Sequence, residues 1–492
     1  MALKSFWPVA SVALAQSGLV ALLLTMVSPL RALAIAVAMP GALVVLLSPR
    51  LGVYGLAATL IGQWPWNGMR YFGVLVAASA LAWQLLQRKR LFPPNPILIL
   101  MGLFVVFVLL STISPRSRIG MTSMVLTYLG HFTLVWLCAI LIDSRQAVQT
   151  VIWVMVSAGV IVAILGLIQW RTHFVWPAST TAVELSLAFF DHKTGMDLQG
   201  WLGTFRIDSI TGTPDLYALY MQTLMPFVIF WTVRQRSLIR WLWGGLILGL
   251  LGVTHLLSFT RGALITTVLV LFLVGWMLDR RRLLAFGPVL ILVGCVTLLA
   301  WSPLRERVLS MITFKPAPGV AAHLESGKWR LAVLPYAFRM LFENPITGIG
   351  VEQTRYHWPD EAKHLIPSVK GLAPVELHQS YLKVGIELGW GGLAVFLLLI
   401  FTALRRLYWV ASSFQAMGER QLADTARAML AALIGLAFAL LMYPMLDAFR
   451  YFWLLLGLTG SLLHLEKSLT QISGNLTSEP IGSVTTAVNL HS

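Results

Sequence analysis

The sequence predicts an all-α protein that crosses a membrane many times, and three observations lead to this prediction. Hydrophobic residues make up 58% of the 492 positions, and charged residues make up only 11%, where a soluble protein would carry about 25%. Apolar runs of about 20 residues, the length of a membrane-spanning helix, recur along almost the whole chain. Each run is predicted to be helical because hydrocarbon offers the backbone no other hydrogen-bond partner. A water-soluble enzyme, a disordered tail protein and a collagen-like fibre are excluded.

The polytopic helix bundle is predicted to have about fourteen spans, within a range of about twelve to fourteen. The first run, Phe6–Ser28, is too long for the core of a signal peptide and lacks a clear small-residue cleavage site, so it is predicted to be a span. The predicted spans cover 6–28, 31–48, 51–65, 71–87, 95–113, 119–142, 147–170, 211–233, 240–258, 262–278, 284–301, 379–403, 426–446 and 449–465.

The orientation follows from the basic residues between spans. Dense clusters lie at 88–90, 234–240, 280–282 and 405–406, and with fourteen spans all four fall on the cytoplasmic side together with both termini. The net charge of +16 is attributed to these anchors and to an anionic substrate rather than to nucleic acid. In a bacterial inner membrane the opposite face is the periplasm.

Four regions follow from this topology. Residues 1–301 hold the N-terminal transmembrane helices and a periplasmic loop near 171–210, and residues 302–377 form a large periplasmic loop. Residues 378–466 hold the C-terminal transmembrane helices, and 467–492 are predicted to be a disordered cytoplasmic tail. Long loops tend to carry function, so the site is expected on the periplasmic face.

The sequence contains no recognisable metal or cofactor motif. Cys138 and Cys295 each lie inside an apolar run, where a cysteine is expected to be a small buried hydrophobe. The sequence has no P-loop, no CxxC motif and no Asp-rich metal motif. We therefore predict no metal and no cofactor, so that arginines would stabilise any anionic leaving group.

Arg206 precedes a predicted helix start. Thr213 fits an N-cap, Pro214 the first helical position and Asp215 the first turn. A helix N-terminus beside an arginine is a natural anion site. The alternative is a structural pair between Arg206 and Asp208 or Asp215.

Two further arginines lie on the predicted outer side. Arg261 occupies the tight turn between two spans, where it either binds an anion or extends to the headgroup level. Arg339 lies in a stretch whose spacing predicts an amphipathic helix along the membrane surface, with a solvated charge as the alternative. Arg330 and Arg305, in the same loop, rank below Arg339.

His378 lies at the outer mouth of the next span, and histidine can accept a proton near neutral pH. The same span carries Lys383 and Glu387 four residues apart, which predicts a buried or interfacial ion pair. Gly385 and Gly389 form a GxxxG spacing, which predicts close helix packing below the histidine. A purely structural histidine is the alternative.

Together these segments resemble the O-antigen ligase and polymerase superfamily of bacterial membrane glycosyltransferases. The similar segments are Arg206–Tyr220, Phe259–Ala263, Arg339–Gly350, His378–Leu382 and Glu387–Gly389. The sequence departs from the pattern at three positions, because Asp215 and Gln379 stand where the family often has asparagine and Thr260 stands where it has serine.

The resemblance implies a metal-independent, inverting glycosyltransferase. Such an enzyme moves a glycan from a polyprenyl (undecaprenyl) diphosphate carrier to an acceptor sugar hydroxyl at the periplasmic face. It implies that His378 is the catalytic residue, as the general base or as the group that orients the acceptor, and that Arg206, Arg261 and Arg339 bind the diphosphate. Asp215, Tyr381 and Glu387 belong to the same motifs and are expected to support these groups.

Three functions remain open. The first is a polymerase of O-antigen or exopolysaccharide repeat units, and the second is an O-antigen ligase that transfers polymer to lipid A–core. The third, of another class, is a transporter or flippase of lipid-linked glycans, although the paired halves typical of transporters are not evident. The expected partners are the carrier-linked oligosaccharide, an acceptor glycan or glycolipid, membrane lipids and a chain-length regulator.

Overall fold

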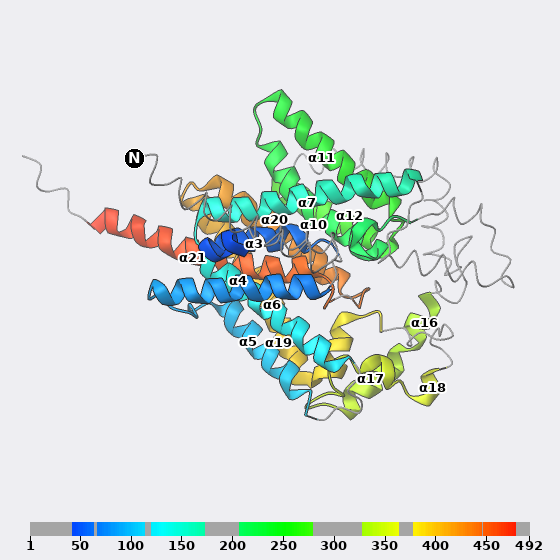
Figure 1. The fold of residues 1–492 in the computed structure, drawn as a ribbon. Coiled ribbons are helices and arrows are strands. Elements are labelled where there is room, and N and C mark those ends of the chain that lie inside the picture. Colours follow the sequence, from blue (N-terminus) through cyan, green and yellow to red (C-terminus); the bar gives the residue numbers. More distant parts are fainter. Residues whose placement is uncertain are drawn as a thin grey trace, which may run out of the picture. The chain divides into compact units, whose positions relative to one another are not determined.

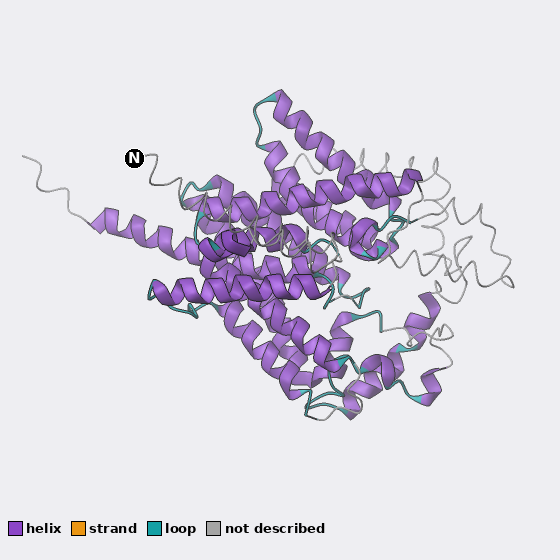
Figure 2. Ribbon diagram, in the orientation of Figure 1, coloured by secondary structure: helices purple, strands orange, loops and turns teal. Residues whose placement is uncertain are grey.

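The computed structural model describes residues 42–62, 66–113, 120–172, 206–278, 327–363, 377–444 and 446–478. These residues form helices joined by turns and contain no strand (Figure 2), which confirms the all-α fold class. The chain divides into two compact units. The first comprises Met1–Leu56 and Pro65–Leu91, and the second comprises Ala57–Trp64 and Phe92–Ser492.

The described part of the first unit is built around α4 (Trp66–Leu86) and the first turns of α3 (Pro49–Thr59). The Ser79 hydroxyl donates to the carbonyl of Val45 at 2.8 Å. Val76 packs directly on Gly52, where an added Cβ would lie 2.7 Å from the valine side chain. The absence of a side chain at Gly52 therefore permits this contact.

The second unit contains the remaining described helices, in chain order: α5 (Pro96–Leu110), α6 (Met121–Leu141), α7 (Arg145–Thr172), η1 (Ser209–Thr211), α10 (Pro214–Val233), α11 (Leu238–Leu257), α12 (Arg261–Leu278), α16 (Gly327–Ala332), α17 (Leu334–Glu343), η2 (Thr354–Tyr356), α18 (Asp360–Lys363), α19 (Ser380–Ala416), α20 (Arg420–Ala439) and α21 (Arg450–Ser478).

Seven of the described helices are long and apolar enough to cross a membrane, namely α6, α7, α10, α11, α12, α19 and α20. Two shorter apolar helices cover Tyr71–Leu86 and Pro96–Leu110. These helices support a multi-pass membrane protein. The predicted spans 6–28 and 284–301, and most of 31–48, lie outside the described residues, so the count of fourteen stays a prediction.

Two predicted boundaries are wrong. Helix α19 continues to Ala416, so Arg405 and Arg406 lie within a helix and not in a loop. No glycine or proline interrupts residues 401–416, and the helix ends before Gly418, which adopts φ +78°. Helix α21 reaches Ser478, twelve residues beyond Glu466, after which we expected a disordered tail. Residues 479–492 lie outside the described residues.

Helices α10 and α20 form the interior of the second unit. About four fifths of each apolar segment is buried (83% and 78%), compared with 22% for α11 and 28% for α12. Helix α10 contacts α7, α11, α12 and α20, and Figure 1 shows α7, α10, α12 and α20 side by side. The N-terminus of α10 therefore lies among the ends of the neighbouring helices.

The described part of the large loop, 327–363, packs on the start of α19. The predicted amphipathic helix forms as α17, which buries Ala337, Met340 and Leu341 and exposes Phe338 and Phe342. The buried face belongs to an apolar cluster that joins the loop to α19. Its members are Val333, Ala337, Met340, Leu341, Ile349, Trp358, Ala362, Leu377, Leu382 and Ile386.

Candidate active site

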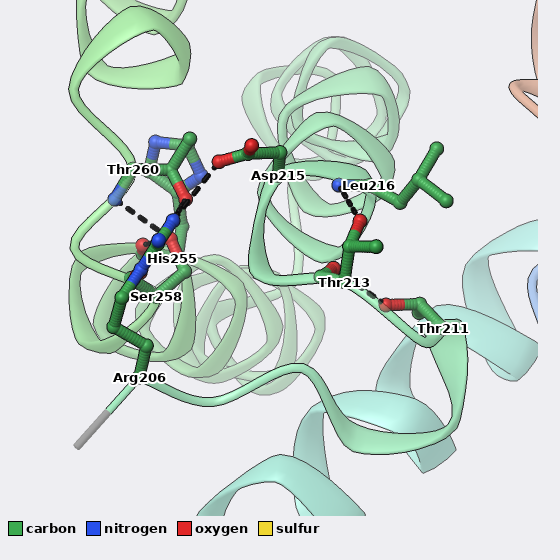
Figure 3. A network of polar contacts seen from close by, with 8 residues as sticks. All are labelled: Arg206, Thr211, Thr213, Asp215, Leu216, His255, Ser258 and Thr260. Carbon is green, nitrogen blue, oxygen red and sulfur yellow. Dashed lines mark hydrogen bonds and ion pairs between the residues drawn. The ribbon is translucent and has the colours of Figure 1, made fainter. Parts of the chain in front are cut away.

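The start of α10 forms as predicted. Thr213 has extended backbone angles, and its hydroxyl accepts a hydrogen bond from the amide of Leu216 at 3.1 Å. Pro214 is the first helical residue and Asp215 lies in the first turn. The capping threonine and the fixed φ of proline explain why the helix begins here. Figure 3 shows this cap and the polar groups around it.

Arg206 links this helix start to the turn between α11 and α12 (Figure 3). Its Nη2 donates to Asp215 Oδ1 at 2.9 Å and to Thr260 Oγ1 at 3.2 Å, and its Nε donates to the carbonyl of Ser258 at 3.0 Å. Its side chain is 21% exposed, so it is held in place yet still reaches solvent.

Asp208 is held in place by α7. It is fully buried and accepts a hydrogen bond from Gln169 Nε2 at 2.7 Å. The Gln169 carbonyl oxygen in turn accepts from the amides of Asp208 and Ser209. The end of α7 therefore fixes the segment that carries Arg206, and the carboxylate that pairs with Arg206 is Asp215.

Arg261 is the first residue of α12, next to Gly262. A Cβ on Gly262 would lie 2.5 Å from the hydroxyl of Tyr443, so this tyrosine lies directly against the turn. The Arg261 guanidinium interacts electrostatically with Arg206, Asp215 and Tyr443. The structure thus brings two of the predicted arginines, Arg206 and Arg261, to one place.

Arg330, in α16, joins this group from the large loop. Burial lowers the pKa of its guanidinium, and the charges of Arg206 and Arg261 lower it further, whereas Asp215 and Tyr443 raise it. These mutual effects place Arg330 in the same electrostatic cluster. Arginine remains protonated even so. Of the three guanidinium groups, that of Arg206 forms the ion pair with Asp215, and the cluster carries excess positive charge.

His378 lies at the end of the loop, two residues before α19. The pKa of its imidazole is lowered to about 3, mainly by burial and also by the charge of Arg330, while Asp215 acts in the opposite direction. The imidazole is therefore neutral at physiological pH and able to accept a proton. The next residue, Gln379, is the N-cap of α19, and its side chain accepts a hydrogen bond from the amide of Leu382.

The residues after His378 fix α19 against the end of α20. The amide of Ser380 donates to the carbonyl of Leu440 at 2.8 Å, and its hydroxyl donates to the carbonyl of Tyr443 at 2.5 Å. The Tyr381 hydroxyl donates to the carbonyl of Ala437 at 2.6 Å. Tyr381 therefore supports the site by joining two helices.

Arg339 lies apart from this cluster. Its side chain is 58% exposed, and its Nε donates to Glu343 Oε1 at 2.8 Å on the same helix. The groups that act on its charge are Glu343, Glu361 and Tyr336. The arginine that the loop contributes to the cluster is Arg330, which we had ranked below Arg339.

A second polar cluster lies deeper along α19. The Thr354 hydroxyl donates to Glu387 Oε1 at 2.8 Å, so Glu387 anchors the large loop. The Lys383 ammonium forms an ion pair with Glu352 at 3.3 Å, which is also a contact to the loop. Lys383 and Glu387, which the sequence predicts to pair, are both buried, and each also contacts the large loop.

Helix α19 is broken at Gly389, which adopts φ +73° and ψ −179°. A Cβ at this position would lie 2.4 Å from the carbonyl oxygen of Ile346. The amide of the following residue, Trp390, donates to the carbonyl of Pro345 at 2.9 Å. The loop backbone thus replaces the helical hydrogen bond that the break removes.

Two glycines allow the loop to approach this break. The amide of Ile349 donates to the carbonyl of Ile386 at 2.9 Å, and the amide of Gly350 donates to the carbonyl of Glu387 at 3.2 Å. Gly348 adopts φ +66°, and a Cβ there would lie 2.3 Å from the backbone of Glu387. The glycine-containing turn is therefore fitted to the broken helix.

The close helix packing that the spacing of Gly385 and Gly389 predicts is confirmed at Gly385 but not at Gly389. A Cβ on Gly385 would contact Leu341 of α17 at 3.1 Å, and Gly389 faces the loop backbone. Both glycines therefore pack against the large loop. The spacing indicated close packing correctly but did not identify the partner or the non-helical φ.

Tyr443 is a feature of the site that was not predicted. Tyr443 follows α20 in a turn, and burial raises the pKa of its hydroxyl, which therefore stays protonated. Nothing in the local sequence marks it. Among the described residues, no group of three or more His, Cys, Asp or Glu side chains is arranged to hold a metal ion. Cys138 is buried, as expected, and Cys295 lies outside the described residues.

Comparison with known proteins gives one match. Residues 246–397 match the family model described as O-antigen ligase, and no curated protein matches the chain. The matched segment runs from α11 into α19 and includes Arg261, Arg330 and His378, whereas Arg206 and Tyr443 lie outside it. The match supports a membrane enzyme that transfers glycans. The match, which covers residues 246–397, supports an assignment to the O-antigen ligase and polymerase superfamily.

Proposed function

We propose that the protein transfers a glycan from a polyprenyl diphosphate carrier to an acceptor sugar hydroxyl at the periplasmic face of a bacterial inner membrane. The observation that carries this proposal is the ion pair of Arg206 with Asp215, a carboxylate that also interacts electrostatically with Arg261, Arg330 and His378. Excess guanidinium charge at the ends of apolar helices suits a membrane-bound diphosphate, because guanidinium offers paired donors to phosphate oxygens.

In the proposed reaction the acceptor oxygen attacks the anomeric carbon from the face opposite the diphosphate. The bond from that carbon to the diphosphate oxygen breaks, and the diphosphate leaves with the electron pair. The configuration at the carbon inverts, and the hydroxyl proton passes to a ring nitrogen of His378. The arginines stabilise the charge that grows on the diphosphate in the transition state, without a metal ion.

Donor binding would tune His378 for this role. In the site as described, burial and Arg330 lower the pKa of the imidazole to about 3, which makes it a weak base. A diphosphate bound to the arginines adds negative charge beside the ring and neutralises the effect of Arg330, so it raises that pKa. His378 would therefore become an effective base only when the donor is present.

We favour the polymerase, which extends repeat units that remain on the carrier. The ligase is the second candidate, because the matched family model is described as O-antigen ligase. Both use the same donor chemistry and differ in the acceptor. A transporter that forms no glycosidic bond is the candidate of another class.

The test is a reconstituted transfer assay with the purified protein in liposomes and a synthetic carrier-linked repeat unit. We expect a new glycosidic bond, detected by mass spectrometry, with either a second carrier-linked repeat or lipid A–core as acceptor, and an unchanged rate in EDTA. Extension of carrier-linked repeats identifies a polymerase, and modification of lipid A–core identifies a ligase. Movement of the donor across the bilayer without a new bond would contradict the proposal.

A further inference from the structure

A cavity of about 330 Å³ lies between α7, α10 and α20, at the helix ends opposite the candidate active site. Arg420 is the first residue of α20, and Arg234 directly follows α10. The candidate active site, by contrast, involves the start of α10 and the residues after α20. The two sites are therefore separated by the length of the helices.

The walls of the cavity are apolar and aromatic. Trp153 of α7 meets Trp231 of α10 edge to face, with ring centroids 5.1 Å apart. Val156, Phe227 and Phe230 continue this surface. A pocket of this size with such walls suits an apolar chain more than a polar metabolite.

The polar residues of the cavity belong to a basic cluster. Arg234 donates to both carboxylate oxygens of Asp424, at 2.6 and 2.9 Å, and Arg427 donates to the same carboxylate at 3.3 Å. Arg145 pairs with Glu419 at 3.0 Å beside the cavity. With Arg420, four arginines face two carboxylates at this end of the bundle, so the region around the cavity attracts anions.

Arg420 has donors available for a ligand. Its side chain is exposed and lines the cavity. No hydrogen bond or ion pair connects its guanidinium to another residue in the part of the chain that the structure describes. The neighbouring Gln421 is also exposed, and its side-chain oxygen accepts from Arg145 at 2.6 Å, so its amide NH₂ can donate to an anion.

We propose that this cavity binds an anionic membrane phospholipid. The lipid phosphate accepts hydrogen bonds from Arg420 and Gln421, and one acyl chain lies between Trp153, Phe227 and Trp231. Basic pockets between membrane helices recognise anionic headgroups in this way. The site occupies the leaflet opposite the glycan-transfer site, and the inference does not depend on the proposed reaction.

The experiment is a lipid titration followed by native mass spectrometry of the full-length protein in detergent. The probes are dioleoyl phosphatidylglycerol, which is anionic, and dioleoyl phosphatidylcholine, which is zwitterionic. We expect preferential binding of phosphatidylglycerol. We expect Arg420→Gln to weaken that binding about fivefold. The control is Arg240→Gln, because Arg240 is exposed at the same end of the bundle but does not line the cavity. We expect this variant to leave phosphatidylglycerol binding unchanged.

A second variant tests the cavity itself without changing charge. Ala428 is buried and lines the cavity, so Ala428→Leu should fill part of the space and weaken lipid binding. If Ala428→Leu does not elute as a folded species, Val156→Leu, which adds volume from α7, is tested in its place. The proposal would be overturned by equal binding of both lipids or by full binding in the filled variant. It would also be overturned if Arg240→Gln lost as much phosphatidylglycerol binding as Arg420→Gln.

Discussion

Arg206 and Asp215 form a 2.9 Å ion pair that joins the segment before α10 to the first turn of that helix. The pair is partly exposed, with 21% and 26% of the two side chains accessible. Asp215 thus supplies negative charge at the point where a helix N-terminus and three arginines would otherwise attract an external anion. The same carboxylate that organises the arginines competes with a diphosphate for them.

Replacing Asp215 by asparagine should therefore strengthen donor binding. Asparagine keeps an oxygen that accepts a hydrogen bond from Arg206 but removes the competing charge. We expect the dissociation constant for a polyprenyl diphosphate to fall by about fivefold, which corresponds to about 1 kcal/mol. Isothermal titration in detergent measures it. Glu343→Gln, which removes an exposed carboxylate paired with Arg339, is the control; weaker binding in Asp215→Asn would contradict the competition.

His378→Ala should remove the base without unfolding the protein, because His378 lies before α19 and the substitution leaves the N-cap residue Gln379 in place. A positioned general base contributes roughly 10²- to 10⁴-fold, so transfer should fall by that factor while donor binding is retained. The rate in liposomes and the dissociation constant are the two measurements. His357→Ala, in the same loop, is the control. Near-normal transfer by His378→Ala would rule out His378 as the base.

Donor binding should also depend on pH through His378. The pKa of the imidazole is lowered to about 3 in the free protein, and a bound diphosphate raises it. A ligand that raises a pKa takes up a proton and binds more tightly as the pH falls toward the raised value. We expect the affinity for a diphosphate to increase between pH 8 and pH 5.5. This increase should be larger in the unmodified protein than in the His378→Ala variant. In that variant the remaining pH dependence comes from the titration of the phosphate alone.

The sequence identified those parts of the site whose role is local. Thr213, Pro214 and Asp215 mark a helix start wherever they occur, because capping depends on neighbours in the chain. Arg206 and Arg261 stood out as charges at predicted helix ends. Each could be located before the structure because apolar periodicity defines the spans and the polar residues mark their limits.

The rest of the site depends on contacts that the sequence does not encode locally. Arg330 and Arg339 lie in the same basic and apolar stretch, yet one is drawn into the cluster and the other pairs with Glu343. Tyr443 reaches Gly262 from a turn far along the chain. The break at Gly389 could not be predicted either, since glycine is compatible with both helical and positive φ.

Arg330 and Arg339 provide a matched pair for testing which arginine of the loop binds the donor. Arg330→Ala removes a guanidinium from the cluster around Asp215, whereas Arg339→Ala removes an exposed one. We expect the first variant to raise the dissociation constant for the diphosphate by tenfold or more, because charge-assisted hydrogen bonds contribute about 1.5 to 3 kcal/mol. We expect the second to have little effect. The opposite order would restore Arg339 to the site.

Gly389→Ala should separate the loop from α19. The substitution places a side chain at φ +73° and brings its Cβ to 2.4 Å from the carbonyl oxygen of Ile346. Both effects are destabilising, and the strained φ alone costs about 1 to 3 kcal/mol. We therefore expect a lower melting temperature and more rapid proteolysis within 327–363.

Gly385→Ala is the control for this prediction, because its Cβ would meet only the flexible ends of Leu341 and Leu393, at 3.1 and 3.2 Å, in a helical conformation. The contrast between the two variants also tests the link to function. Arg330 belongs to the loop that docks on the broken helix, so a displaced loop should weaken donor binding in Gly389→Ala more than in Gly385→Ala. Equal melting temperatures and equal donor affinities would show that the break in α19 does not position the loop.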